Sequence, residues 1–357
     1  MPGHAALRPP DGAARLVDGL HGHGAGPEPG VQPGQHRARS HRGGQRAAGH
    51  LPAGAVRILL TGAGGLLGTA VTAAAGARGW TCTPLPRPAL PDAPGALAAR
   101  LAEGWDLLIH AAANTNVEAC ETDPSACYRD NLLLTELIAT ATARAGTKLL
   151  FVSSTGVYGD AQATPWREYD AVAPTTHHHR SKVLAEQCVL AAAAGNLVVR
   201  TGWLFGGPPA NPKNFVARRL DEARAVLAAG TVMASNAQQR GVPCYSADIA
   251  GRMLDLAAGG LAGVFNCVNG GSASRHEYVQ AIVDAAGLAL AVQPSAAASF
   301  RRVAKVSDNE MAENWKAAML GWPAMPDWRT SLAGYVLSEL DEYAGQIRRE
   351  QANHGTD

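Results

Sequence analysis

The sequence of 357 residues lacks several features that would assign it to a specialised class of protein. Aromatic residues make up only 5%, no apolar run reaches the roughly 18 residues that a membrane span needs, and no CxxC pair occurs. The six cysteines are scattered, which argues against a disulfide framework or a zinc site and favours a reducing, cytoplasmic compartment. The formal net charge of +1 gives no electrostatic sign of binding to nucleic acid or to an anionic membrane.

The first 54 residues lack lysine and show no apolar periodicity. They also lack the apolar segment of about 7–15 residues that a signal peptide requires. Six of the twelve histidines fall here, among many glycines, prolines and arginines. This composition predicts that residues 1–54 are a disordered tail, or that the start codon is assigned too far upstream and these residues are not translated. The fold prediction therefore begins at residue 55.

A strand and a glycine-rich turn open the ordered part of the chain. Residues 56–60 (VRILL) form an apolar run of strand length, and residues 61–68 (TGAGGLLG) lead into an alanine-rich helical stretch. Strand, glycine turn and helix in this order are the context that a dinucleotide-binding fingerprint requires. A plain glycine-rich turn is the alternative.

Each glycine of this turn has a role in such a fingerprint. Gly62 permits the tight turn, Gly65 lets the backbone approach a pyrophosphate, and Gly68 lets the helix pack closely on the strand. The phosphates would bind at the first helical residues, Leu66 and Leu67, where free N–H groups and the helix dipole favour anions.

Alternation of apolar runs with helical patterns continues along the chain. Strands are predicted at 80–85, 106–110, 147–153, 196–201 and 263–267, between helices at 94–103, 123–144, 175–195, 213–229 and 246–258. Further helices are expected at 274–287, 309–320 and 328–345. The pattern predicts an α/β fold of Rossmann type, a doubly wound parallel sheet with a small C-terminal substrate lobe.

We divide the chain accordingly. Residues 55–205 form the NADP-binding domain, and 231–268 return to its sheet. Residues 206–230 and 269–345 form the substrate-binding lobe, and 346–357 form a tail.

The second strand lacks the acid that would bind the ribose hydroxyls of NAD, but Arg87 follows it. An arginine there accommodates a 2′-phosphate, which favours NADP(H) and leaves NAD(H) as the alternative. A solvated loop position is the other interpretation of Arg87.

Four further motifs resemble those of the extended short-chain dehydrogenase/reductases. They are residues 109–113 (IHAAA), 128–131 (YRDN), 152–159 (VSSTGVYG) and 178–186 (HHRSKVLAE). A second set is similar to the dTDP-4-dehydrorhamnose reductases within that superfamily: 115–117 (TNV), 200–206 (RTGWLFG), 214–216 (NFV), 239–245 (QRGVPCY), 248–250 (DIA) and 320–332 (LGWPAMPDWRTSL). The resemblance covers residues 56–345.

The resemblance implies a reaction in which NADPH gives a hydride to a sugar C4 ketone. A tyrosine delivers the proton, a lysine four residues later lowers the pKa of that tyrosine and holds the nicotinamide ribose, and a serine or threonine binds the ketone oxygen. Lys182 matches the lysine and Ser154 the serine. Asn131 lies in the helix that faces the cofactor. Small side chains that let the cofactor lie against the strand end are Ala111, Ala112 and Ala113.

The same resemblance points to the substrate site. Arg240 matches a position that can contact the substrate diphosphate, and a guanidinium suits bidentate phosphate binding. A surface ion pair is the alternative for Arg240. Thr115, Trp203 and Asn214 are candidates for the sugar or base pocket, although Trp203 is equally consistent with a core position.

One departure from the family pattern affects the chemistry, since His178 stands where the family has its tyrosine. His178 can act as the general acid, although the charge of Lys182 would disfavour its protonated form. Proton delivery can instead fall to Ser154, Thr155 or water. In a third interpretation the chain binds nucleotide without catalysis, and a different reaction on the same scaffold is also open.

The sequence therefore predicts an NADPH-dependent reductase of a nucleotide-linked 4-keto-6-deoxy sugar in deoxysugar biosynthesis. A nucleotide-sugar epimerase and a non-catalytic NADP-binding regulatory protein are the alternatives. No metal site is expected, because the consecutive side chains of His177, His178 and His179 point about 100° apart on a helix. The expected partner is the nucleotide-sugar substrate, with neither nucleic acid nor membrane, and a homodimer is left open.

Overall fold

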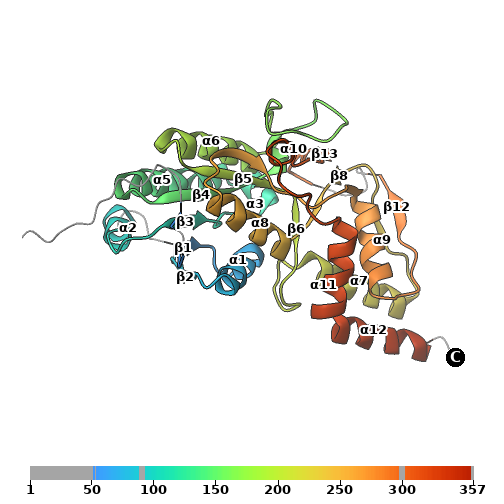
Figure 1. Cartoon of the computed structure of the whole chain (residues 1–357). Helices are drawn as coiled ribbons and strands as arrows, with labels where there is room; N and C mark the ends of the chain where they lie inside the picture. The colour runs from blue at the N-terminus through green and yellow to red at the C-terminus, as the bar shows by residue number, and fades with distance from the viewer. Residues whose placement is uncertain (1–50, 53, 88–92, 297–301, 355–357) are drawn as a thin grey trace, which may run out of the picture. The chain divides into compact units, whose positions relative to one another are not determined.

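Six parallel strands form the central sheet of the computed structural model, which describes residues 51–52, 54–87, 93–296 and 302–354 (Figure 1). The strand order is β10-β5-β4-β3-β1-β2. Because β1 is paired with both β2 and β3, the order reverses there, and ligands of such sheets bind beyond the carboxyl ends of the strands at this point. The strands are β1 (Arg57–Thr61), β2 (Thr81–Pro84), β3 (Leu107–His110), β4 (Lys148–Ser154), β5 (Leu197–Thr201) and β10 (Gly263–Asn266).

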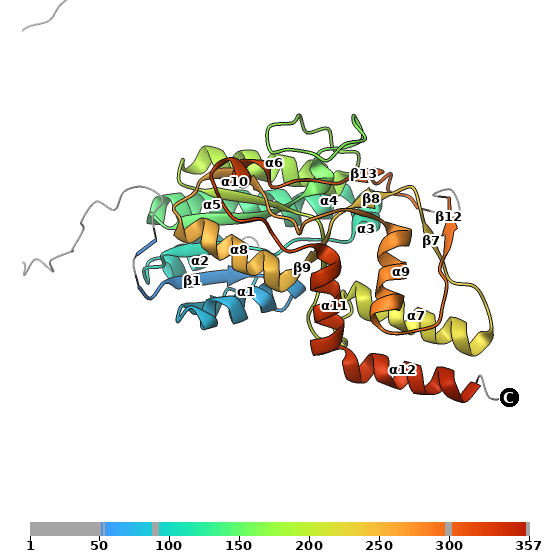
Figure 2. The same ribbon diagram turned by 45° about the vertical axis from the view of Figure 1, so that its right-hand side comes forward.

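Alternate apolar residues of each strand enter two different cores, one on either face of the sheet. Ile58 and Leu60 of β1 pack with α1 (Leu66–Ala77) and α8 (Ser246–Ala258). Leu59 packs on the opposite face. That face is covered by α2 (Ala93–Leu101), α5 (Leu134–Ala145) and α6 (His177–Ala192), as Figures 1 and 2 show. The predicted doubly wound α/β fold is confirmed.

The chain between β3 and α5 is helical but interrupted. Helix α3 (Val117–Thr122) ends before Pro124, which starts α4 (Pro124–Tyr128) at a position that needs no N–H donor. A π-helical turn (Arg129–Leu133) then leads into α5. Such turns insert one extra residue into the hydrogen-bond ladder and often occur at functional sites. This turn contains Asn131.

The C-terminal lobe has a core of its own. Aromatic and aliphatic side chains from α7 (Phe215–Ala229), α9 (Arg275–Ala285), α11 (Trp328–Glu339) and α12 (Asp341–His354) pack together, with Trp328 fully buried. Figure 2 shows these helices beside the sheet domain. Three small sheets lie outside the central one. They pair β6 (Trp203–Phe205) with β9 (Pro243–Tyr245), β7 (Ala234–Asn236) with β12 (Gln293–Ser295), and β8 (Arg240–Gly241) with β11 (Ala273–Ser274) and β13 (Asn309–Glu310).

The structure differs from the sequence prediction in three places. The predicted helix 309–320 begins as strand β13, and only α10 (Trp315–Met319) is helical, because Asn309 and Glu310 pair with β8. Within 231–268, only β10 enters the central sheet, while β7, β8 and β9 belong to the small sheets. Helix α12 continues to His354 with Ile347 buried, so regular structure extends past residue 345. The expected tail 1–54 lies outside the described residues except for 51, 52 and 54.

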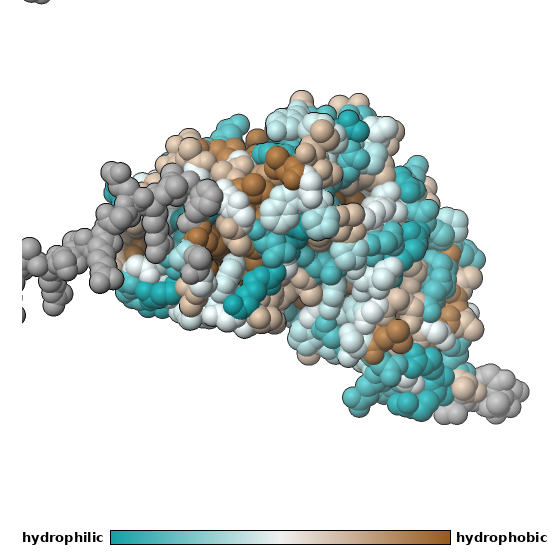
Figure 3. All heavy atoms as spheres, in the orientation of Figure 1, coloured by the Kyte–Doolittle hydropathy of each residue, from teal (hydrophilic) through white to brown (hydrophobic). Residues whose placement is uncertain are grey.

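The visible face of the molecule is mostly polar, with scattered apolar groups (Figure 3). Within the described ranges, no helix has the length and apolar character needed to cross a membrane.

Candidate active site

The turn after β1 has the geometry of a phosphate cradle. Gly62 has φ +74, and a Cβ there would come within 2.8 Å of the backbone nitrogen of Ala112. A Cβ on Gly68 would lie 2.1 Å from the carbonyl oxygen of Gly62. Helix α1 begins after Gly65 without a side-chain cap and without an acid in its first turn, so its N–H groups suit an anion. These features fit the pyrophosphate of a dinucleotide.

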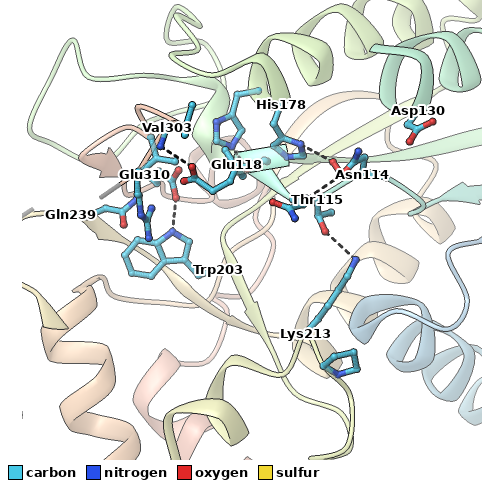
Figure 4. Close-up of a pocket in the computed structure, with 18 of the residues that line it drawn as sticks. Asn114, Thr115, Glu118, Asp130, His178, Trp203, Lys213, Gln239, Val303 and Glu310 are labelled. Carbon is cyan, nitrogen blue, oxygen red and sulfur yellow. Dashed lines mark hydrogen bonds between the residues drawn. The ribbon is translucent and has the colours of Figure 1, made fainter. Parts of the chain in front are cut away.

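A cavity of about 1510 Å³ is lined by residues at and after the ends of β3 and β4 and by residues of the C-terminal lobe (Figure 4). It contains six residues that the sequence analysis selected: Arg87, Ala113, Thr115, Ser154, His178 and Trp203. Its other lining residues come mainly from the loop after β3, from α7 and α9, and from residues 302–306. The tertiary fold therefore brings six of the seventeen selected site residues together in this cavity.

Asn131 lies beside the cavity and fixes one of its walls. Its Oδ1 accepts from the backbone N–H of Asn114 at 2.7 Å, and its Nδ2 donates to the carbonyl of Asn114 at 3.1 Å and to Ser181 Oγ at 3.1 Å. The side chain is buried, and these bonds leave it clamping the loop after β3 rather than facing the cavity. A contact between Asn131 and the cofactor stays a prediction, and in the structure its side chain holds the loop after β3.

Ser154 and two histidines meet at the sheet end of the cavity. Ser154 ends β4 and accepts the N–H of Gly156 at 3.2 Å. Thr176 is the N-cap of helix α6, and its Oγ1 accepts the N–H of His179. Both His178 and His179 therefore lie in the first turn of this helix. His179 Nε2 lies 3.5 Å from Ser154 Oγ, and His178 Nδ1 lies 3.0 Å from the carbonyl oxygen of Asn114.

Burial keeps both imidazoles neutral. The pKa of His178 is well below its usual range because the ring is desolvated, and the neighbouring His179 and Lys182 lower it further. Burial also lowers the pKa of His179, although the charge of Glu310 opposes this shift. His178 is therefore unprotonated near neutral pH and has no acidic proton to donate.

Lys182 lies beneath the cavity rather than in it. Its Nζ donates to the carbonyl of Val152 at 2.9 Å and lies 4.6 Å from the centre of the Phe151 ring. Burial lowers the pKa of Lys182 to about 8. One turn further along α6, Glu186 forms a buried ion pair with Arg200 at 2.6 Å. The lysine therefore acts on the imidazoles through its charge in this structure.

The predicted substrate residues separate into two groups. Thr115 Oγ1 accepts from Lys213 Nζ at 3.0 Å, and Trp203 donates from Nε1 to Glu310, all of which line the cavity. Asn214 is fully buried, and its side chain caps α7 and donates to the backbone of 207–208 and to Tyr335. Arg240 forms an ion pair with Glu277 at 3.3 Å outside the cavity lining.

Three other arginines that line the cavity, Arg218, Arg275 and Arg302, were missed by the sequence analysis. Arg275 stacks on the Trp203 ring at 3.4 Å, and Arg218 projects from the first turn of α7. Both also line an adjoining cavity of about 1030 Å³, together with Arg180, Arg219, Arg302 and Lys305. The available signals were positional: Arg218 follows the α7 cap at Asn214, and Arg275 follows the α9 cap at Ser274.

Arg87 lines the cavity together with Asp130. Its guanidinium pairs with Asp130, which also accepts from Arg129 at 3.1 Å. Its side chain is 53% exposed, so it can reach a ligand without losing this partner. Nothing acidic is found at the end of β2 among residues 81–87, where NAD-specific sheets have a carboxylate.

A parallel sheet with a glycine turn after its first strand, and a serine, a lysine and an imidazole near the strand ends, defines an NAD(P)-dependent oxidoreductase of the short-chain dehydrogenase/reductase type. The chain belongs to the RmlD substrate-binding domain family, whose model matches residues 56–340.

Known relatives agree with this assignment. The dTDP-4-dehydrorhamnose reductase of Mycobacterium tuberculosis is 34% identical over 285 residues, which cover 78% of this chain and 91% of the relative. The Mycolicibacterium smegmatis reductase is 29% identical over 86% of this chain and 93% of its own length. A solved dTDP-4-dehydrorhamnose reductase from Yersinia enterocolitica is 28% identical, with TM-score 0.71 over 79% of this chain and 98% of that one. The Bacillus anthracis reductase, solved with NADP, has TM-score 0.73 at 24% identity over 79% and 99%.

Proposed function

We propose that this protein uses NADPH to reduce the 4-keto group of a nucleotide-linked 6-deoxy sugar in deoxysugar biosynthesis, the reaction for which its Mycobacterium tuberculosis relative is named. One observation carries the proposal. Ser154 and His178 lie at the sheet end of a cavity whose other end is lined by Arg218 and Arg275. A ketone at one end and a diphosphate at the other would match these two environments.

The sheet end of the site would hold the cofactor. The turn at Gly62 and Gly65 suits the pyrophosphate, and Arg87 suits the 2′-phosphate of NADP. The Bacillus anthracis relative binds NADP, which supports this choice. When bound, the nicotinamide supplies the hydride for the reduction.

The lobe end would hold the nucleotide part of the substrate. Arg218 and Lys213 offer exposed cations, and Arg275 offers a guanidinium that stacks on Trp203. The adjoining basic cavity has room for a base and a ribose. Its Phe215 gives an aromatic surface against which a base can stack.

The test follows NADPH absorbance with dTDP-4-keto-6-deoxyglucose, for the full chain and for His178→Tyr in parallel. Oxidation of NADPH by the native protein is the expected result. Restoring the family tyrosine should raise kcat by about tenfold or more, since a well-placed acid typically contributes 10²–10⁴-fold. If neither protein consumes NADPH although both bind it, the proposed reduction is overturned.

A second candidate is supported by His178 itself. An imidazole whose pKa is well below its usual range is unprotonated near neutral pH and has no acidic proton to deliver, which fits a protein that binds NADP(H) and nucleotide without turnover. Activity confined to His178→Tyr would favour this candidate. Tightly held NAD in the purified protein would favour an epimerase instead. We place the protein in the cytoplasm, which its six free cysteines support.

A further inference from the structure

Three polar side chains form a continuous line from the start of α6 to the cavity. Thr176 Oγ1 lies 3.0 Å from His179 Nδ1, and His179 Nε2 lies 3.5 Å from Ser154 Oγ. Ser154 and His179 line the cavity, whereas Thr176 is fully buried behind them. A bond of 3.5 Å is long, but catalytic hydrogen bonds often shorten only when substrate is bound.

Burial of Thr176 determines which way this line of bonds runs. Its Oγ1 accepts the backbone N–H of His179 at 3.2 Å. Among the residues that the structure describes, His179 Nδ1 is the acceptor that lies within hydrogen-bond distance of the Thr176 hydroxyl. A buried hydroxyl hydrogen without an acceptor is costly, so Thr176 donates to Nδ1. A neutral imidazole that accepts at Nδ1 carries its hydrogen on Nε2, and His179 therefore donates to Ser154.

Ser154 is left with one direction in which to donate. Its Oγ accepts from the N–H of Gly156 at 3.2 Å and from His179 Nε2. With both acceptor positions filled, its own hydrogen points into the cavity that it lines. The ring of His179 is held against Gly156, where a Cβ would lie 2.2 Å from Nε2. Gly156 thus makes room for this imidazole.

His178 has the opposite polarity. Its Nδ1 lies 3.0 Å from the carbonyl oxygen of Asn114, which can only accept, and 3.4 Å from Nδ2 of Asn131. The two hydrogens of that amide have nearer acceptors in the Asn114 carbonyl and Ser181 Oγ, so Nδ1 of His178 carries the ring hydrogen and donates to Asn114. The neutral ring then has a lone pair on Nε2. Burial, which lowers the pKa of both imidazoles, maintains the neutral forms that this assignment requires.

We infer that His179 is the positioning residue that fixes the direction in which Ser154, the expected ketone-binding serine, donates its hydrogen, and that His178 offers the substrate a lone pair and no proton. The inference rests on the proposed reduction. The ketone carbon gains the hydride, the C=O π electrons move to oxygen, and that oxygen takes one proton from solvent water. Two donors aligned behind Ser154 would strengthen its bond to the developing oxyanion.

The first test needs no catalytic activity. The full chain is labelled with ¹⁵N in its histidine rings, and a long-range ¹H–¹⁵N spectrum at neutral pH distinguishes the two neutral tautomers. The signals are assigned by their loss in His178→Tyr and His179→Gln. We expect the Nδ1–H tautomer for His178 and the Nε2–H tautomer for His179. An Nδ1–H tautomer at His179 would overturn the inference whether or not the proposed function holds.

The second test separates orientation from a merely structural role. His179→Leu removes the donor and should lower kcat by about tenfold, with KM changed by less than about twofold, because the lost bond matters most in the transition state. His179→Gln retains an N–H near the position of Nε2 and should recover kcat to within about threefold of the native value. His177→Leu, on the same turn but outside the cavity lining, is the matched control and should keep kcat.

Equal losses in His179→Leu and His179→Gln would show that the ring only fills space, which contradicts a directional role. Thermal unfolding of each variant, with NADPH binding followed by fluorescence, verifies that the fold is retained.

Discussion

Single side chains in this site owe their chemistry to what surrounds them more than to their type. His178 occupies the position of a proton donor, but desolvation and the charge of Lys182 keep it neutral. Lys182 itself is committed to a backbone carbonyl. Ser154 becomes the strongest candidate to contact the ketone because two neighbours fill its acceptor positions.

Arg87 provides a test of cofactor preference. Replacing Arg87 with Ala should raise KM for NADPH by about tenfold to a hundredfold and leave KM for NADH nearly unchanged, since charged hydrogen bonds contribute about 1.5–3 kcal/mol. Steady-state kinetics with NADPH and with NADH give the ratio of the two KM values for each protein. Arg129→Ala is the matched control, because Arg129 pairs with the same Asp130 but does not line the cavity. Equal effects of the two variants would show that Arg87 acts only through Asp130.

Arg218 and Arg240 distinguish the structural assignment of the diphosphate site from the sequence-based one. Arg218 is exposed and lines both cavities, whereas Arg240 pairs with Glu277 elsewhere. Arg218→Ala should therefore raise KM for the sugar nucleotide by about tenfold, and Arg240→Ala by less than about twofold. KM measured at saturating NADPH decides between them. A larger effect at Arg240 would favour the position chosen from sequence.

Among the elements, α1 and the turn before it depend most closely on particular residues. Gly65 begins the helix without a side-chain cap, and Gly68 lets the first turn lie against the Gly62 carbonyl. The π-helical turn at Arg129–Leu133 has a comparable role on the other side, because it directs Asn131 toward the loop after β3. Both elements support the site through backbone contacts.

Two glycines of α1 make a matched pair. Gly68→Ala would place a Cβ 2.1 Å from a backbone oxygen, so the helix must move away from the turn. We expect a loss of about 2 kcal/mol or more in the free energy of unfolding and a strong loss of NADPH affinity. Gly76→Ala meets open space in the same helix and should be stabilising by about 0.5–1 kcal/mol. Urea unfolding measures the stability of each variant, and NADPH titration measures its affinity for the cofactor. If Gly68→Ala changed neither quantity, the close packing of α1 on the turn would be contradicted.

For the molecule as a whole, the separation into a sheet domain and a lobe with its own core creates the cavity between them. The two sheet cores contain the strand residues, and the lobe core contains Trp328, Tyr278 and Phe205. The reacting groups come from the sheet domain, and the basic groups come mainly from the lobe. Neither part would form the complete site alone.

Buried histidines should make the stability of the whole molecule depend on pH. His110 is enclosed between Thr61 Oγ1 at 2.7 Å and Thr135 Oγ1 at 3.0 Å, and burial lowers its pKa to about 3. The unfolded chain binds a proton at pH 6.5 that the folded chain does not, so stability is lost as the pH falls from about 6.5 toward 3. His110 alone should cost about 2 kcal/mol between pH 6.5 and pH 5.

His110→Gln isolates this contribution, because glutamine is uncharged at every pH and can still bond the two threonines. Its free energy of unfolding, measured in urea at pH 7 and pH 5, should fall by about 2 kcal/mol less than that of the native protein. Parallel pH dependences in the two proteins would show that His110 is protonated in the folded state.

Local patterns in the sequence were enough to predict the fold class, the glycine turn, the positions of the six strands of the central sheet and the family. Strand alternation and the demand for φ above zero at Gly62 act over a few residues, so they can be recognised without coordinates. Helix 309–320 was predicted wrongly, because the pairing of Asn309 and Glu310 with β8 depends on residues about 70 positions away.

Only the tertiary structure decided which polar groups share the cavity. It directs Asn214 into a helix cap and Arg240 into a surface ion pair, and it brings in Arg218, Arg275 and His179. It also decided the proton positions that we infer for the imidazoles, since burial, the Asn114 carbonyl and the Thr176 hydroxyl set them. Side-chain direction, desolvation and long-range charge are properties of the folded chain, which is why sequence spacing identified the reaction class but not the complete site.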